Sequence, residues 1–173
     1  MSFAAADPTA HSAYRLGALA LLMAAGAIVI ALGFEHIGGY VPCELCLKER
    51  YAYYAGVPLL FAALVLLSAA QSRAAAALFA VVGLAFLANA ALGTYHAGAE
   101  WGFWLGPQAC SGQQALTTSA GGLLDALQHT SVVRCDVASW RFAGLSFAGW
   151  DVVASVLIAF LSLRAAGEAL RAR

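Results

Sequence analysis

The chain has 173 residues, of which 62% are hydrophobic and only 10% are charged, and its formal net charge is zero. Soluble domains carry about 25% charged residues, so this chain has too little polar surface to coat a water-soluble globule. It also has no stripe rich in Lys and Arg that would neutralise nucleic-acid phosphates. Length and composition therefore predict a single membrane domain over residues 1–173, with no nucleic-acid partner.

Four long apolar runs predict four transmembrane helices. A helix needs roughly 20 apolar residues to cross the hydrocarbon core of a bilayer, and such runs cover residues 16–34, 51–70, 74–95 and 146–163. The first run follows a basic residue, as a signal peptide would, but it is long for a signal core. The predicted fold class is therefore all-α, an integral membrane four-helix bundle.

Two unequal connections leave the spans on the same side of the membrane. They cover about residues 35–50 and 96–145, whereas the second and third spans are joined by a tight turn at residues 71–73. Within the longer loop, residues 121–133 have an amphipathic pattern. This pattern predicts a short helix that lies either flat on the membrane or against the bundle.

Arginine placement predicts how the chain is oriented. Five arginines lie in short segments on the side of the two termini: Arg15, Arg73, Arg164, Arg171 and Arg173. The positive-inside rule then predicts cytoplasmic termini and two extracytoplasmic loops. Four tryptophans near the outer ends of the spans suit an aromatic belt at the membrane interface: Trp101, Trp104, Trp140 and Trp150.

All four cysteines, Cys43, Cys46, Cys110 and Cys135, fall in the two outer loops. Four cysteines on an oxidising side suggest disulfides, with three possible pairings, of which the spacing favours Cys43–Cys46 and Cys110–Cys135. A Cys-x-x-Cys ring is too small to stabilise the fold much through chain entropy. Such a pair is more typical of redox chemistry. Without the first pair, the second pair would be interpreted as a structural clamp that stabilises the loop by about 3 kcal/mol.

Arg50 gives the Cys-x-x-Cys pair a chemical context. If a helix begins near Cys43, then Cys46 and Arg50 are four residues apart and share one face. The guanidinium would favour a thiolate at Cys46 and could bond a carbonyl oxygen of an electron acceptor. The alternative is an interfacial arginine that reaches toward lipid head groups. A dithiol at the membrane edge passes electrons most simply to a quinone.

Three stretches of the chain resemble one known family. "PCELCLKER" resembles the Pro-Cys-x-x-Cys-x-x-x-Arg signature of the disulfide bond formation protein B (DsbB) family. "TYHAG" after the third span resembles that family's Tyr/His segment, and "CDVASWRFAGLSFAGWDVV" resembles its passage into the fourth helix. The resemblance extends over nearly the whole chain.

The resemblance implies a quinone-dependent protein-disulfide oxidoreductase of the bacterial inner membrane. Such a protein reoxidises a periplasmic DsbA-type thiol oxidase and passes the electrons to ubiquinone or menaquinone. An incoming thiolate would attack Cys110, freed Cys135 would attack Cys43, and Cys46 would donate to the quinone with help from Arg50.

Further polar residues carry open alternatives. His96 matches a family position near the quinone, and could either hydrogen-bond a quinone oxygen or cap the interface. His36 is expected to be an interfacial side chain, and Asp151 to be satisfied by partners near the head of the fourth span. Glu44, inside the dithiol motif, could tune its redox potential.

Two rival classes of protein remain. Four cysteines and four histidines could bind zinc or copper(I) in a metal-binding or metal-transporting membrane protein. Against transport, polar ligands do not recur along the apolar runs, and the DsbB-like interpretation itself requires no metal. The other rival is a structural membrane bundle with two disulfides, which leaves Arg50 without a purpose.

Overall fold

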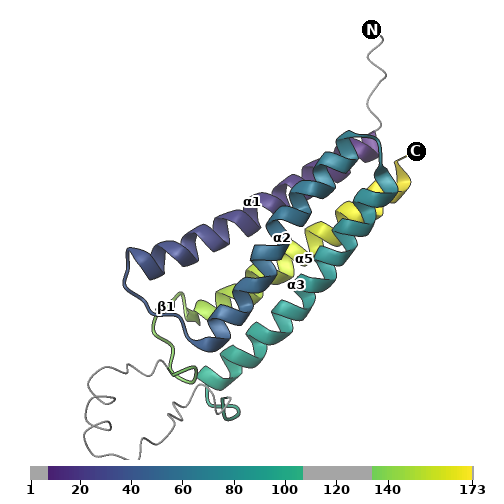
Figure 1. Cartoon of the computed structure of the whole chain (residues 1–173). Helices are drawn as coiled ribbons and strands as arrows, with labels where there is room; N and C mark the ends of the chain where they lie inside the picture. The colour runs from purple at the N-terminus through teal and green to yellow at the C-terminus, as the bar shows by residue number, and fades with distance from the viewer. Residues whose placement is uncertain (1–7, 107–133, 173) are drawn as a thin grey trace, which may run out of the picture.

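The computed structural model describes residues 8–106 and 134–172 (Figure 1). These ranges contain four long helices, α1 (Pro8–His36), α2 (Glu44–Ser68), α3 (Ser72–Glu100) and α5 (Phe147–Arg171). All four are long and apolar enough to cross a membrane. The predicted all-α membrane bundle is therefore confirmed, and the protein is a multi-pass membrane protein.

The helices extend beyond the apolar runs that predicted them. Helix α2 begins at Glu44 and α3 continues to Glu100, so polar ends that the sequence suggested were loop are helical. The start of α2 is capped by Cys43, whose sulfur accepts a hydrogen bond from the backbone N–H of Cys46. Ser146 caps α5 in the same way through Gly149, which satisfies a backbone donor that a helix start otherwise leaves free.

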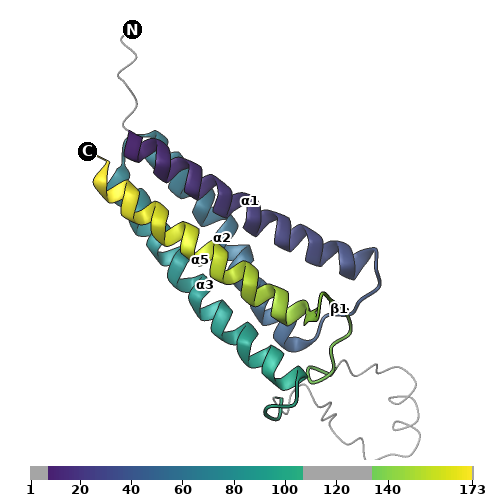
Figure 2. The same cartoon turned by 180° about the vertical axis from the view of Figure 1, so that it is seen from behind.

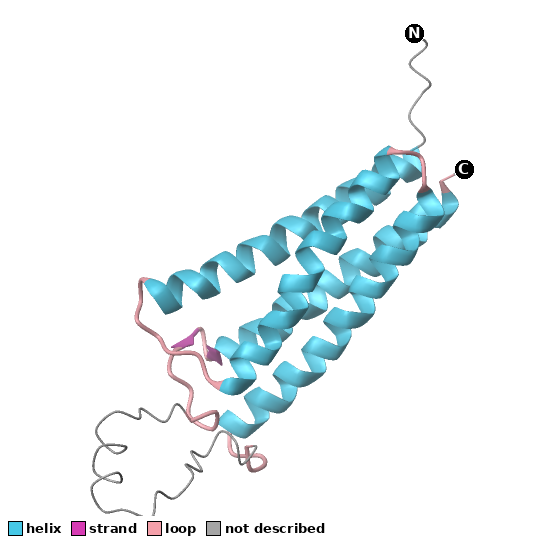
Figure 3. Ribbon diagram, viewed as in Figure 1, coloured by secondary structure: helices cyan, strands magenta, loops and turns pink. Residues whose placement is uncertain are grey.

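A small hairpin precedes α5. Strands β1 (Arg141–Phe142) and β2 (Leu145–Ser146) pair antiparallel, with Arg141 opposite Ser146 (Figure 3). Ala143 and Gly144, which link them, both have positive φ. The hairpin leads the longer connection directly into the first turn of α5.

Many of the buried side chains of the bundle are small, and many large apolar side chains face outward. Ala20, Ala63 and Ala159 are fully buried, whereas Leu22 and Phe61 are 68% and 62% exposed. In water, so many exposed large apolar side chains would be unfavourable. In a bilayer they face lipid, and the helices associate through close contact of small residues. The outward-facing large apolar side chains are independent support for a membrane protein.

The helices form a ring in which α1 contacts α2 and α5, and α3 contacts α2 and α5. The start of α1 and the end of α5 lie at one end of the bundle (Figures 1 and 2). The start of α2, the end of α3 and the hairpin lie at the other, which we call the dithiol end. The amphipathic segment predicted at residues 121–133 lies outside the described residues.

Candidate active site

The dithiol lies at the start of α2. Cys43 is the N-cap residue and Cys46 is in the first turn, and the two free sulfurs are 2.9 Å apart. The backbone N–H of Cys46 also donates to Cys43 Sγ at 3.2 Å. Only 5% of Cys43 is exposed. The turn therefore holds the sulfurs close enough to form a disulfide with little movement.

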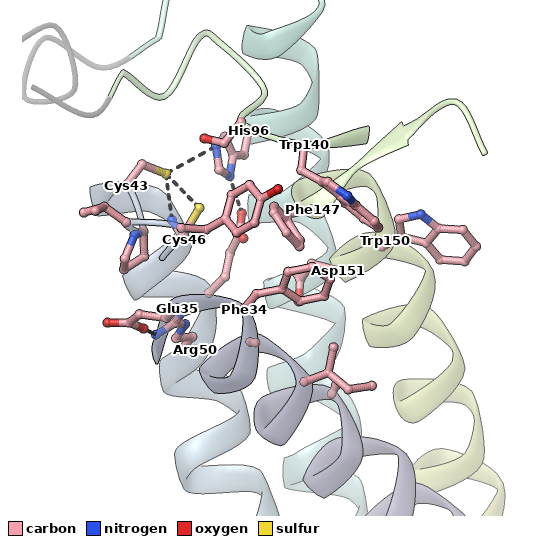
Figure 4. Close-up of a pocket in the computed structure, with 18 of the residues that line it drawn as sticks. Phe34, Glu35, Cys43, Cys46, Arg50, His96, Trp140, Phe147, Trp150 and Asp151 are labelled. Carbon is pink, nitrogen blue, oxygen red and sulfur yellow. Dashed lines mark hydrogen bonds and ion pairs between the residues drawn. The ribbon is translucent and has the colours of Figure 1, made fainter. Parts of the chain in front are cut away.

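His96 reaches the dithiol from α3. Its Nε2 atom is 3.6 Å from Cys43 Sγ, and its Nδ1 atom is 2.8 Å from Glu49 Oε1 (Figure 4). The ring is 1% exposed. A carboxylate can only accept, so Nδ1–H donates to Glu49 and the opposite ring nitrogen faces the sulfur. His96 is thus buried beside the dithiol, and its predicted role toward a quinone stays a prediction.

Electrostatics favour negative charge on Cys43. The pKa of Cys43 is lowered chiefly because the Cys46 thiol donates a hydrogen bond to its sulfur. Burial opposes this effect, and the contact with His96 lowers the pKa further. The lowered pKa therefore belongs to the thiol at the helix N-cap, where the helix dipole also favours an anion.

The predicted role of Arg50 beside Cys46 stays a prediction. Both residues line one cavity, but the guanidinium is ion-paired with Glu35 of α1 (Figure 4). The thiolate support comes from Cys46 and His96 and falls on Cys43. The spacing argument placed Cys46 and Arg50 on one face but had no means of finding a partner on another helix.

The longer connection returns to the dithiol through Cys135. This residue is 1% exposed, is disulfide-bonded, and packs in one small cluster with Cys43 and Leu45. Cys110 lies outside the described residues. A cysteine of the second loop is therefore in place beside the thiol of the first whose pKa is lowered.

A cavity of about 460 Å³ opens beside the dithiol. Its walls come from α1, α2, α3, α5 and both connections. Phe34, Trp140 and Phe147 form an aromatic wall, with ring centroids 4.8–5.2 Å apart in each pair (Figure 4). Trp140 and Trp150 line this cavity, a position that the aromatic-belt interpretation did not predict. Cys46 and His96 also line the cavity, at its dithiol end.

Asp151 is held by a second polar cluster. Tyr53 Oη donates to Asp151 Oδ1 at 2.6 Å, and Asn89 Nδ2 donates to Oδ2 at 3.1 Å. Asn89 also donates to Ser155 Oγ at 3.0 Å. A Cβ atom on Gly93 would lie 3.0 Å from the carboxylate, so glycine lets it approach α3. The expectation that Asp151 is satisfied by partners is confirmed.

Glu35 and Glu49 were not singled out from the sequence. Glu49 had a usable signal, because it follows Cys46 by three residues and must share its helix face. Glu35 had none, because it belongs to another helix. His36, Glu44 and Lys48 do not line the cavity, and Glu44 is ion-paired with Lys48 at 2.8 Å.

A partly buried dithiol at one end of a transmembrane bundle, packed beside a loop cysteine and open to an apolar cavity, suits thiol–disulfide exchange at a membrane. The family model for the disulfide bond formation protein DsbB matches residues 14–165. The chain therefore belongs to the DsbB family, as its motifs predicted, and is a disulfide-forming oxidoreductase of the membrane.

Named relatives agree with this assignment. The chain is 30% identical to disulfide bond formation protein B of Marinobacter nauticus over 84% of this chain and 86% of the relative. It is 33% identical to disulfide bond formation protein B 2 of Pseudomonas entomophila over 83% and 84% of the two chains. No solved structure matches the chain.

Proposed function

We propose that this protein reoxidises a soluble periplasmic thiol oxidase of the DsbA type and passes the electrons to a membrane quinone, ubiquinone or menaquinone. We place it in the bacterial inner membrane with both termini in the cytoplasm. One observation carries the proposal: the Cys43–Cys46 dithiol lies between Cys135 on one side and an apolar cavity on the other.

The outer steps are thiol–disulfide exchanges. A thiolate of the reduced partner attacks Cys110 of a Cys110–Cys135 disulfide, and Cys135 leaves as a thiolate. Cys135 attacks Cys43, and the Cys43–Cys46 bond breaks to free Cys46. The partner's second thiolate then releases oxidised partner, and freed Cys110 attacks Cys135. Two electrons have now moved to Cys43 and Cys46, and the outer disulfide has re-formed.

The thiol states in the structure suit the last of these stages. Cys43 and Cys46 are free, while Cys135 is disulfide-bonded. The contact between Cys135 and Cys43 supports attack at Cys43 rather than at Cys46. Cys46 also lines the cavity and becomes the free sulfur in that step.

The cavity residues fit a quinone. Ligand pockets typically measure about 300–1,000 Å³ and are mostly apolar with a few placed polar groups, as this one is. The aromatic wall of Phe34, Trp140 and Phe147 suits a flat ring, and Arg50 and His96 offer polar atoms at the dithiol end. A bound quinone supplies the capacity to accept two electrons and two protons.

Residues of this chain can supply the electrons and handle the protons of that reaction. As the Cys43–Cys46 disulfide forms, the pair gives up two electrons and two protons. His96 Nε2 faces Cys43 and can take the proton that leaves this thiol when its thiolate forms, while Glu49 orients the ring. Arg50 is held by Glu35 at the cavity wall, where its donors can bind a carbonyl oxygen.

Quinone reduction by the purified protein in detergent tests the proposal, with a reduced DsbA-type protein as donor. Loss of quinone absorbance is expected for the natural chain and for Leu47→Ala, a half-exposed neighbour outside the cavity. Cys46→Ala should show no turnover. The proposal fails if folded, oxidised natural protein reduces neither ubiquinone nor menaquinone with any of several donors.

A further inference from the structure

We propose that Cys43, Cys46 and His96 form a binding site for a thiophilic metal ion, of which Zn²⁺ is the type, that exists only while the dithiol is reduced. These residues come from the N-terminus of α2 and the last turns of α3. In the described part of the chain they are the group whose ligand atoms all lie within 4.8 Å of one another.

The spacing of the donor atoms suits zinc. With Zn–S bonds of about 2.3 Å and Zn–N bonds of about 2.0–2.1 Å, tetrahedral ligand atoms lie about 3.5–3.8 Å apart. Cys43 Sγ and His96 Nε2 are already 3.6 Å apart. The two sulfurs, at 2.9 Å, need only rotate slightly apart about their Cα–Cβ bonds. The ligand atoms of all three residues already lie within 4.8 Å of one another.

His96 is already oriented as a metal ligand. In metal sites a ligating histidine usually donates its other ring N–H to a carboxylate, which fixes the ring and raises its basicity. The Glu49 carboxylate binds Nδ1 at 2.8 Å and leaves Nε2 directed at Cys43 Sγ (Figure 4). The Glu49 side chain is only 7% exposed, so this partner is built into the bundle rather than supplied by chance at the surface.

A fourth position is available near the three ligands. Glu100 Oε1 lies 3.9 Å from His96 Nε2, and its side chain is 6% exposed. The cavity also reaches Cys46, His96 and Glu100, so a water molecule could complete the tetrahedron instead. Three protein ligands with one open position is an ordinary zinc arrangement.

Metal binding and disulfide formation exclude each other at this site. Binding converts two thiols into two metal–thiolate bonds and releases two protons, with no change of oxidation state. The disulfide form offers no thiolate, so it cannot hold the ion. An ion bound to the reduced pair would therefore stop electrons from leaving it. The site would make disulfide formation sensitive to free thiophilic metal.

The test needs neither a quinone nor a thiol partner. Full-length protein carrying Cys110→Ser and Cys135→Ser, in detergent, retains only the two dithiol cysteines of the four in the chain. After reduction and removal of the reductant, it is titrated with Co²⁺, whose thiolate charge-transfer and ligand-field bands report coordination. We expect one Co²⁺ per chain, two protons released per ion, and displacement by Zn²⁺. The same protein with its dithiol oxidised should give no bands.

A histidine outside the group, His36, serves as a control for His96. His96→Ala should weaken Co²⁺ binding at least tenfold, whereas His36→Ala, which changes a histidine of α1 outside the group, should leave it unchanged. Glu49→Gln should weaken binding about 10–100-fold through the imidazole, with both thiols still titratable. Helix content by circular dichroism checks that each variant is folded.

Three results would overturn the metal site. They are equal Co²⁺ affinity in folded His96→Ala protein, equal binding by the oxidised protein, or one ion shared between two chains. Each leaves quinone reduction by the natural chain intact. Failure of quinone reduction, in turn, would not alter the Co²⁺ titration, so the two proposals fail separately.

Discussion

The two ends of the bundle differ in what they bury. Toward the termini, fully buried Ala13, Phe79 and Ala169 belong to one hydrophobic cluster, with no charged side chain among the buried residues described there. At the dithiol end Glu49 and His96 are buried beside an open cavity. Buried charge is costly in a membrane, so a charge that is kept there indicates a functional site. The end near the termini therefore stabilises the bundle through packing. The dithiol end carries buried charge and a cavity, which stabilise it less.

The largest expected effect comes from removing either sulfur of the dithiol. Cys43→Ser and Cys46→Ser should each abolish quinone reduction, because no second sulfur remains to complete the disulfide. The free energy of unfolding should change by only about 1 kcal/mol, the net contribution of one hydrogen bond. Steady-state turnover and denaturant unfolding, measured on the same preparations, check both statements. A serine variant that retains turnover would remove the dithiol from the relay.

Phe79→Ala should show the opposite pattern. Phe79 is fully buried where α1 approaches α3, so its loss should lower the free energy of unfolding by about 3–5 kcal/mol. Turnover per folded molecule should be unchanged, because Phe79 does not line the cavity. Phe61→Ala, which removes a 62% exposed phenylalanine, is the matched control and should lose far less stability.

His96→Gln should lower turnover about a hundredfold, the usual size of a lost proton-transfer group. The Gln side chain can still hydrogen-bond but cannot take a proton at neutral pH. Glu49→Gln should cost less and should shift the pH profile of turnover, because it acts through the ring that it orients. Rates across pH 5–9 separate the two roles. Unaltered rate and profile in both variants would make His96 structural.

A substitution at Gly17 tests how tightly the helices pack near the termini. A Cβ atom there would lie 2.6 Å from the Phe79 ring, whereas one at Gly26 on the same helix meets nothing within 4 Å. Gly17→Ala should therefore destabilise the bundle by about 1–3 kcal/mol. Gly26→Ala should be neutral or slightly stabilising, since alanine favours helix by up to about 1 kcal/mol. Equal unfolding midpoints would show that α1 is not packed tightly against α3.

The smallest effect concerns pH. Because its pKa is lowered, chiefly by the Cys46 thiol, reduced Cys43 should keep its thiolate as pH falls below the ordinary cysteine pKa of about 8.5. The thiolate should be lost only when pH falls through the lowered value. Thiolate absorbance of reduced Cys110→Ser, Cys135→Ser protein against pH measures this. Cys46→Ala in that background should move the midpoint upward, and an unmoved midpoint would assign the effect to His96.

Much of the architecture could be predicted from local sequence. The four spans follow from run length, because a bilayer accepts only segments whose backbone bonds are satisfied internally. The motif around Cys43, Cys46 and Arg50 indicated the family together with the second cysteine pair and the four-span topology. Helix ends were less predictable: α2 starts at Glu44 because a cysteine, not one of the usual capping residues, accepts the first backbone hydrogen bond.

The composition and the cysteine motif by themselves determined that this is a membrane bundle with a redox-type dithiol. Only the tertiary structure decided which residues meet that dithiol. His96 reaches Cys43 across 53 positions, Glu49 reaches His96 across 47, and Tyr53 reaches Asp151 across 98. These contacts depend on how each helix is rotated and tilted against its neighbours. That rotation is set by the small residues packed between the helices, and no local spacing in the sequence encodes it.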